Sequence, residues 1–247
     1  MNKSKYIYPV LAMVFLISAF SKPGSYGNAS VIITFQNTAN GKPIVLNDSI
    51  YTNSFNETYT LRKLKYYISN IILEAGNKQF IEKESYHLVD ATHENSFSVS
   101  IPPGKYTSIR FIAGVDSARN CSGAQGGALD PLNDMFWTWH SGYVMFKLEG
   151  SSPSSKADLN RIEHHIGGYK GPNNTIRNIH LTFSTPLVIT NNKSAEIFIR
   201  TNIDNYWKGI NEIRISDIPV NTIPGEQAKR SADNFPGMFS LINAILF

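Results

Sequence analysis

The run Tyr66-Tyr67-Ile68-Ser69-Asn70-Ile71-Ile72-Leu73 is rich in β-branched and aromatic side chains, which is typical of a β-strand. Similar runs recur along the chain, and turn-forming Gly, Pro, Asn and Asp residues separate them. They lie at residues 31–35, 97–101, 106–112, 143–149, 176–183, 187–190 and 195–200. Because little helical periodicity lies between them, the sequence predicts an all-β fold, an antiparallel two-sheet β-sandwich with long loops.

Two short helices are expected beside these strands. Asp130 followed by Pro131 is a suitable N-cap and first helical residue, and predicts about one turn. A second helix is predicted from Ser231 to the end of the chain, where apolar residues recur at helical intervals. These residues are Met238, Phe239, Ile242, Ile245 and Leu246.

The first 21 residues have the pattern of a secretory signal peptide. Lys3 and Lys5 precede an apolar run at residues 8–17, and Ala19-Phe20-Ser21 offers a small-residue cleavage site. A membrane anchor needs about 20 apolar residues, and polar residues from position 18 onward interrupt this run. We therefore predict a signal peptide at residues 1–21, a single domain at 22–247, a periplasmic or secreted location, and no stable membrane insertion after cleavage.

Composition and net charge indicate a folded globular protein and argue against nucleic-acid binding. The 247 residues are 42% hydrophobic, enough for a full core, and the formal charge is +4. Removing Lys3 and Lys5 lowers the charge to +2, which does not favour nucleic-acid binding. The lone cysteine, Cys121, lies in a Gly-rich stretch, so we expect a free loop thiol.

The most unusual segment spans residues 129–143 and holds two of the three tryptophans, Trp137 and Trp139. Met135 precedes His140 by five residues, and such soft and borderline metal ligands beside paired tryptophans suggest an oxidisable metal site. The alternative is an aromatic-rich core strand with an incidental histidine. On a strand, His140 would face away from both tryptophans, so a site containing all three requires a bulge or a helical turn.

Histidines also occur as a pair, His164 and His165, followed by Gly167 and Gly168. Adjacent residues on a strand point to opposite faces, so only one of the two can join a given buried site. We assign His165 to the inward face, and the glycines permit close backbone approach. The alternative is a surface pair before a turn. His180, His87 and His93 are expected at the surface.

Enzyme motifs are missing: the sequence has no G-x-S-x-G elbow, P-loop or H-E-x-x-H. Oxygen ligands from Asp116, Asp130, Asp134 and Asn133 could hold calcium, although such residues between strands more often form turns. Glu163 beside the histidine pair could act as an acid or base, but no nucleophile accompanies it. We predict a protein that is not an enzyme, with calcium only as a weak possibility.

Several of these segments resemble the MbnP-like copper-binding proteins, relatives of MopE and CorA of methane oxidisers. The resemblance is carried by Leu129-Asp130-Pro131, Met135-Phe136-Trp137-Thr138-Trp139, Ser141-Gly142-Tyr143, Lys147-Leu148-Glu149-Gly150, His165-Ile166-Gly167-Gly168 and Ala232-Asp233-Asn234. Further matches lie at residues 65–71, 86–90 and 113–117.

The resemblance implies an exported β-sandwich that binds copper, as Cu(I) or Cu(II). A partner di-haem peroxidase would oxidise one tryptophan of the Trp-x-Trp pair to kynurenine. The implied metal-site residues are His165, His140, Trp137 and Trp139, with Trp137 favoured as the modified one; His140 stands where many relatives have Asn or Gln. The alternative function is a metal-free secreted β-sandwich, a binding or adhesion module in which the aromatic segment is structural.

Overall fold

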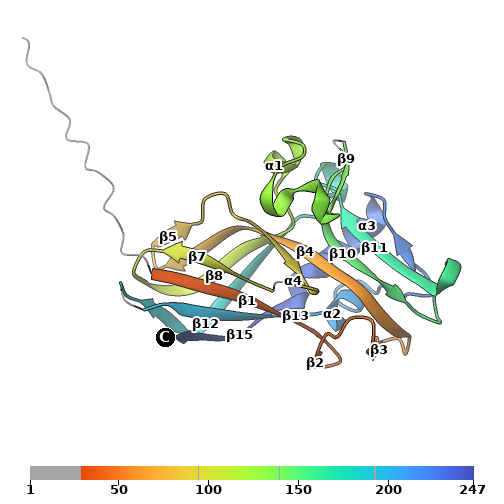
Figure 1. Ribbon diagram of the computed structural model, residues 1–247, viewed down its shortest axis with the longest axis horizontal. Helices are drawn as coiled ribbons and strands as arrows, with labels where there is room; N and C mark the ends of the chain where they lie inside the picture. The colour runs from red at the N-terminus through yellow and green to blue at the C-terminus, as the bar shows by residue number, and fades with distance from the viewer. Residues whose placement is uncertain (1–28, 94, 139, 192) are drawn as a thin grey trace, which may run out of the picture.

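The computed structural model describes residues 29–93, 95–138, 140–191 and 193–247, so the predicted signal peptide lies outside the described residues. Two sheets pack face to face, with short helices at their ends and in the connections (Figure 1). The predicted all-β sandwich is confirmed. Among the described residues, we find no helix that combines the length and the apolar character needed to cross a bilayer.

The smaller sheet has the strand order β15-β13-β1-β2, and β7 also pairs with β1. Its strands are β1 (Ala29–Ala39), β2 (Lys42–Pro43), β7 (Ser96–Ile101), β13 (Ala195–Asn202) and β15 (Phe239–Leu246).

The larger sheet has the order β12-β8-β4-β10-β11-β14, with β3, β5 and β6 also on β4 and β9 on β10. Its strands are β3 (Ile50–Thr52), β4 (Thr58–Ala75), β5 (Lys78–Ile81), β6 (Tyr86–Asp90), β8 (Gly104–Ala113), β9 (Phe136–Thr138), β10 (Gly142–Ser151), β11 (Arg161–Gly167), β12 (Arg177–Ile189) and β14 (Val220–Asn221).

The sheets are mixed rather than purely antiparallel. β1 pairs with β13 in parallel, and so does β11 with β14, whereas the other strand pairs are antiparallel. Paired residues of β1 and β13, such as Val31 and Ala195, are far apart in the sequence. No hairpin turn therefore joins the two strands or imposes an antiparallel direction on them. The sequence pattern reveals strands but does not specify the direction in which distant strands meet.

Side chains on the strands of the larger sheet point alternately to its two faces, and each face is covered by a different apolar cluster. On β4, Leu64, Tyr66 and Ile68 enter the main core between the sheets. Tyr67 points to the opposite, outer face and belongs to a second, smaller apolar cluster. That cluster also contains Val115, Leu129, Met135, Tyr143, Val144, Met145 and Tyr169, and it lies under the long excursion that links β8 to β10.

The helices are α1 (Ser117–Cys121), α2 (Asp204–Trp207), α3 (Glu226–Asp233) and α4 (Phe235–Met238), with 3-10 turns at Gly127–Leu129, Pro131–Asn133, Asp158–Asn160 and Gly171–Asn173. The turn predicted after Asp130 is present, and the Asp130 side chain accepts a hydrogen bond from the Leu132 N–H.

The predicted helix over the last residues is wrong beyond Met238. Phe239 to Leu246 form β15, which pairs with β13 along its length. The apolar residues at positions 242, 245 and 246 match a helical spacing. Hydrogen bonding to an existing sheet edge nevertheless overrides that local pattern.

Candidate metal centre

The excursion that carries the tryptophans crosses the outer face of the larger sheet, and α1 and β9 rise from the body above β4 and β10 (Figure 1). Lysines from the sheet anchor it. Asp134 Oδ2 lies 2.8 Å from Lys63 Nζ and 2.9 Å from Lys147 Nζ, while Lys65 Nζ donates to the Asn133 carbonyl at 3.3 Å. Lys147 also donates to the Asp134 carbonyl. These contacts fix the start of β9, and therefore the backbone position of Trp137.

The charges at this anchor act on Asp134. Partial burial by itself would raise its pKa, but the hydrogen bonds and positive charges of Lys63 and Lys147 lower the pKa to about 2. Asp134 has left-handed backbone geometry with φ of 61°, which caps the preceding 3-10 turn. A carboxylate held by two ammonium groups is a poor calcium ligand, since the lysines already compensate its charge.

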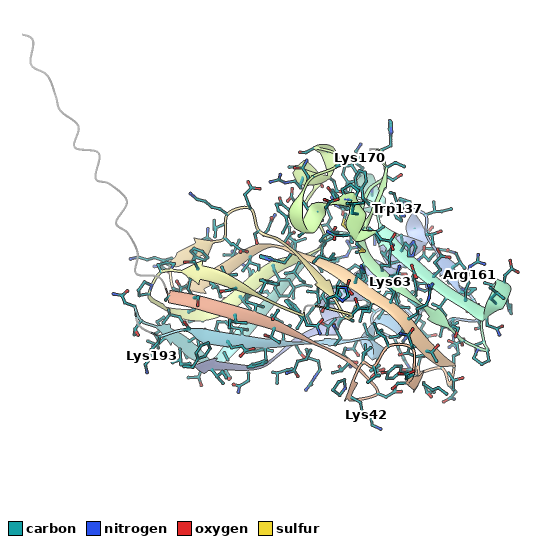
Figure 2. All side chains as sticks on the ribbon, viewed as in Figure 1. Lys42, Lys63, Trp137, Arg161, Lys170 and Lys193 are labelled. Atoms are coloured by element: carbon teal, nitrogen blue, oxygen red, sulfur yellow. The ribbon has the colours of Figure 1, made fainter. Side chains whose placement is uncertain are left out.

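Trp137 is half-buried on this outer face (Figure 2), and its indole lies against Gly167 on β11. A Cβ atom at Gly167 would come within 2.7 Å of Trp137 Cζ3 and within 2.7 Å of the Tyr143 carbonyl oxygen. Only glycine fits there without a shift of its neighbours, so the close approach expected from the glycine pair is present at this residue.

His165 lies two residues before Gly167 on β11 and therefore shares its face. Successive residues on one strand face are roughly 7 Å apart, so Trp137 and His165 occupy neighbouring positions. His165 Nε2 lies 2.9 Å from Glu149 Oε1 and 3.8 Å from Glu163 Oε1, and its side chain is 14% exposed.

Glu149 is the more enclosed of the two carboxylates beside His165, with a side chain 8% exposed against 34% for Glu163. Its second oxygen, Oε2, contacts Arg62 at 2.8 Å and Lys63 at 3.6 Å. The hydrogen bond from His165 lowers the pKa of Glu149 most; burial raises it, and the Lys63 and Arg62 charges lower it further. The carboxylate is therefore ionised at neutral pH.

His164 points the other way, into the main core, and is fully buried. Its Nε2 lies 2.7 Å from the Ile218 carbonyl, which can only accept, so Nε2 carries the proton and Nδ1 accepts from the Tyr206 hydroxyl at 2.6 Å. Burial lowers the pKa of His164 to about 4. The assignment of His165 to the inward face is thus wrong, because Ile162, His164 and Ile166 supply the core side of β11.

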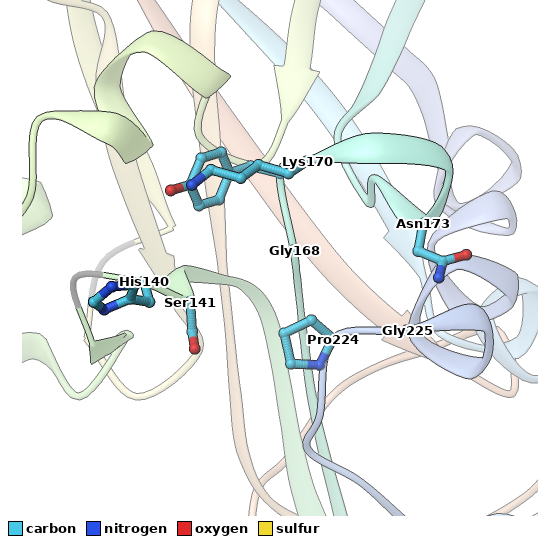
Figure 3. A pocket seen from close by; sticks show the side chains of 8 residues that line it. His140, Ser141, Gly168, Lys170, Asn173, Pro224 and Gly225 are labelled. Carbon is cyan, nitrogen blue, oxygen red and sulfur yellow. The ribbon is translucent and has the colours of Figure 1, made fainter.

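His140 is exposed in the hairpin between β9 and β10 and lines an open cavity of about 430 Å³ with Ser141, Lys170, Asn173 and others (Figure 3). Gly142, at the base of this hairpin, lies five residues before Lys147, the partner of His165 in the register. β10 shifts register between Val144 and Phe146, so Gly167 lies opposite Val144, and the next residue, Gly168, lines the cavity beside His140. His140 therefore lies beyond the Gly167 end of β11, and among the described residues it makes no hydrogen bond or ion pair with His165. Trp139, the remaining predicted site residue, lies outside the described residues.

The other candidates have separate roles. The Asp116 side chain caps α1 and accepts from Tyr86, as Asp130 caps its own turn. His180 is exposed as expected. Cys121 is a free, exposed thiol, but it is the last residue of α1 and not part of the predicted loop. His93 is exposed too, but His87 is partly buried and stacks on Phe97 with ring centroids 3.6 Å apart. Within the described ranges, no group of three or more His, Cys, Asp or Glu residues is arranged to hold a metal ion.

Sequence reasoning missed Glu149 and Lys147 as parts of this site. A signal existed, because Lys147 and Glu149 alternate with the buried Phe146 and Leu148 and must share the polar face of β10. Their pairing with His165 and Glu163 depends on the register between β10 and β11, which the sequence does not specify.

The fold and the site together describe a β-sandwich that carries Trp137 and the carboxylate-bound His165 on the outer face of its larger sheet. The family profile of MbnP matches residues 28–223, and the chain belongs to the MbnP family. Among solved structures, MbnP from Methylosinus trichosporium has a similar fold, with a TM-score of 0.53 and 15% identity over 76% of this chain and 80% of that chain. None of the curated proteins matches the chain. Membership of the family supports a copper-linked role in general.

Proposed function

We propose that this is an exported, non-catalytic copper-binding protein whose site lies on the outer face of β11. The observation that carries the proposal is the indole of Trp137 against Gly167, two residues from the imidazole of His165 on one face. Family membership supports copper as the metal. Copper accepts imidazole readily, and reduced copper accepts sites with few ligands.

The described residues fit copper in part. They offer one imidazole with a carboxylate beside it, but no complete group of ordinary ligands. The thioethers nearby do not complete the set, because Met135 is fully buried in the apolar cluster and Met145 Sδ accepts the Val115 N–H at 3.1 Å. A further donor is therefore needed, and Trp137 of the Trp-x-Trp segment lies against Gly167, two residues from His165 on β11.

Oxidation of Trp137 or Trp139 to kynurenine would supply that donor. An indole offers only an N–H group, whereas kynurenine carries an aromatic amine and a ketone, both with lone pairs. We propose that a partner di-haem peroxidase makes this change, with Trp137 the preferred target because its indole lies against Gly167. A signal peptide at residues 1–21 would direct export to the periplasm or beyond and would be removed from the mature protein.

Copper uptake by the exported protein tests the site. Cuprous copper is added under a reductant, and His165→Ala is compared with wild type and with His180→Ala. His180 is an exposed histidine on β12 and makes a matched control. We expect one copper per chain, a loss of affinity of about a hundredfold or more in His165→Ala, and no change in the control. Unchanged stoichiometry and affinity in His165→Ala would remove His165 from the site.

Modification is tested separately by producing the protein with and without the peroxidase. Peroxide, the oxidant of a peroxidase, would cleave the indole C2–C3 bond with an oxygen atom added to each carbon, and hydrolysis would then release C2 as formate, which leaves the ketone and the aromatic amine of kynurenine. This change alters the intact mass and adds near-ultraviolet absorbance. Peptide mapping then assigns the change to Trp137 or Trp139. If both tryptophans stay intact and copper does not bind, the metal-free binding module becomes the better description.

A further inference from the structure

A carboxylate holds His165 by one particular ring nitrogen. Glu149 Oε1 lies 2.9 Å from Nε2, and Glu149 is ion-paired through Oε2 with Arg62 at 2.8 Å. An ionised carboxylate can only accept hydrogen bonds, so Nε2 must carry a proton. The lone pair of a neutral His165 is then on Nδ1, the nitrogen available to a metal.

The strand register indicates which side of the ring Nδ1 occupies. Lys147 is the partner of His165, and Glu149 lies two residues further along β10, on the side away from Gly167. In an imidazole the Cγ–Nδ1 bond is opposite Nε2. With Nε2 aimed at Glu149, Nδ1 therefore lies on the side of the ring nearer to Gly167 and Trp137.

Nδ1 has no hydrogen-bond partner among the residues that the structure describes, in contrast to Nε2. Glu149 itself is fixed, since it is 8% exposed and Lys63 lies 3.6 Å from its Oε2. The histidine is thus held in one tautomer by a carboxylate that is held in turn by two cations. Histidine ligands commonly donate their second N–H to a carboxylate in this way, which fixes the ring and strengthens the ligand.

We infer that Glu149 is a positioning residue that fixes the Nε2–H tautomer of His165 and presents Nδ1 to the metal. This inference deepens the proposed function and rests on it. It identifies the ligating nitrogen and gives a role, through Glu149, to the Lys147-Leu148-Glu149-Gly150 segment that carries part of the family resemblance.

Nitrogen NMR of the metal-free protein tests the tautomer without any metal. Long-range ¹H–¹⁵N spectra of ¹⁵N-histidine-labelled protein should show a protonated Nε2 and an unprotonated Nδ1 for His165. Glu149→Leu should shift this ring toward a mixture of tautomers, whereas Glu163→Leu should not, since Glu163 lies 3.8 Å from Nε2. An Nδ1–H tautomer in the wild type would overturn the inference.

Silver(I), a diamagnetic substitute for Cu(I), then tests which nitrogen binds. We add Ag(I) to labelled protein made together with the peroxidase and follow both His165 nitrogens. A shift and ¹⁰⁹Ag splitting at Nδ1, with Nε2 still protonated, supports the inference. Splitting at Nε2 overturns it but leaves the proposed function intact. No change at either nitrogen overturns both.

The Glu149→Leu variant adds a quantitative test with a readout other than stability. If Glu149 acts through His165, this change should weaken Ag(I) binding by about 10- to 100-fold, while Glu163→Leu stays near wild type. Equal affinity in wild type and folded Glu149→Leu would contradict the positioning role.

Discussion

Two neighbouring histidines on β11 have opposite surroundings. His164 faces the core, where Tyr206 and the Ile218 carbonyl occupy both of its nitrogens. His165 faces outward beside Trp137, and Glu149 occupies one nitrogen. A fully hydrogen-bonded, buried histidine such as His164 stabilises the fold, whereas His165, whose Nδ1 has no partner among the described residues, is available to bind a metal.

The residues around the two histidines differ in the same way, apolar on the core side of β11 and charged on its outer side. Around His164 the rings of Tyr206 and Trp207 pack with centroids 5.7 Å and 5.6 Å away, all of them fully buried. Around His165 the neighbours are charged, and the loop that carries Trp137 is held by lysine contacts as well as by apolar packing. Changes on the inner face should therefore alter stability, and changes on the outer face should alter copper binding.

The largest expected effect on stability is that of His164→Ala. It creates a cavity and leaves the Tyr206 hydroxyl and the Ile218 carbonyl without partners, so we expect a loss of about 3 to 5 kcal/mol in the free energy of unfolding. His165→Ala should cost less than about 1 kcal/mol. Urea unfolding of both variants measures this. Equal losses would show that the two faces do not differ as described.

The second largest expected effect is a loss of stability in acid, caused by the protonation of His164 in the unfolded chain. Because the pKa of His164 is lowered from 6.5 to about 4 in the folded state, the unfolded chain binds a proton more readily. The free energy of unfolding is therefore not lowered by His164 above about pH 6.5, and it falls as the pH is lowered from 6.5 toward 4. The total loss over this window is about 3 kcal/mol.

Unfolding midpoints between about pH 7.5 and pH 5 isolate this effect, since most carboxyl groups titrate at lower pH. The slope should persist in His165→Ala and vanish in His164→Ala. A wild-type stability that stays flat over this range would contradict the buried neutral state of His164.

The sequence predicted much of the fold but less of the site. Runs of β-branched and aromatic residues between turn formers identified the strands, and the Asp130-Pro131 pair identified its turn, because these signals are local. The assignment of His165 to the inward face failed because His164, and not His165, alternates in step with Ile162 and Ile166, which face the core.

Partners across strands could not be predicted for a related reason. The contact between Glu149 and His165 depends on the β10–β11 register, and that between Trp137 and Gly167 depends on how the excursion folds back. The alternating charges at Lys147 and Glu149 predict a polar strand face, but not which side chains lie opposite them.

A moderate effect is expected where the excursion meets β11. The methyl group of Gly167→Ala would collide with Trp137 Cζ3 and with the Tyr143 carbonyl oxygen, each 2.7 Å away. We expect a stability loss of about 1 to 3 kcal/mol and a changed fluorescence of the displaced indole. Gly126→Ala is the control, because a Cβ there meets no atom within 4 Å. Wild-type copper affinity in Gly167→Ala would separate the indole from the site.

The smallest effect should come from His140→Ala. His140 is exposed at a hairpin, so its removal should change the free energy of unfolding by less than about 0.5 kcal/mol. If the site is centred on His165, which lies on β11 and not in that hairpin, copper affinity should also stay within about twofold of wild type. Titration of both variants with cuprous copper compares the two histidines directly. A loss of affinity in His140→Ala as large as that in His165→Ala would mean that the hairpin folds onto the outer face when the metal binds. The site would then need both ends of the segment that carries the tryptophans.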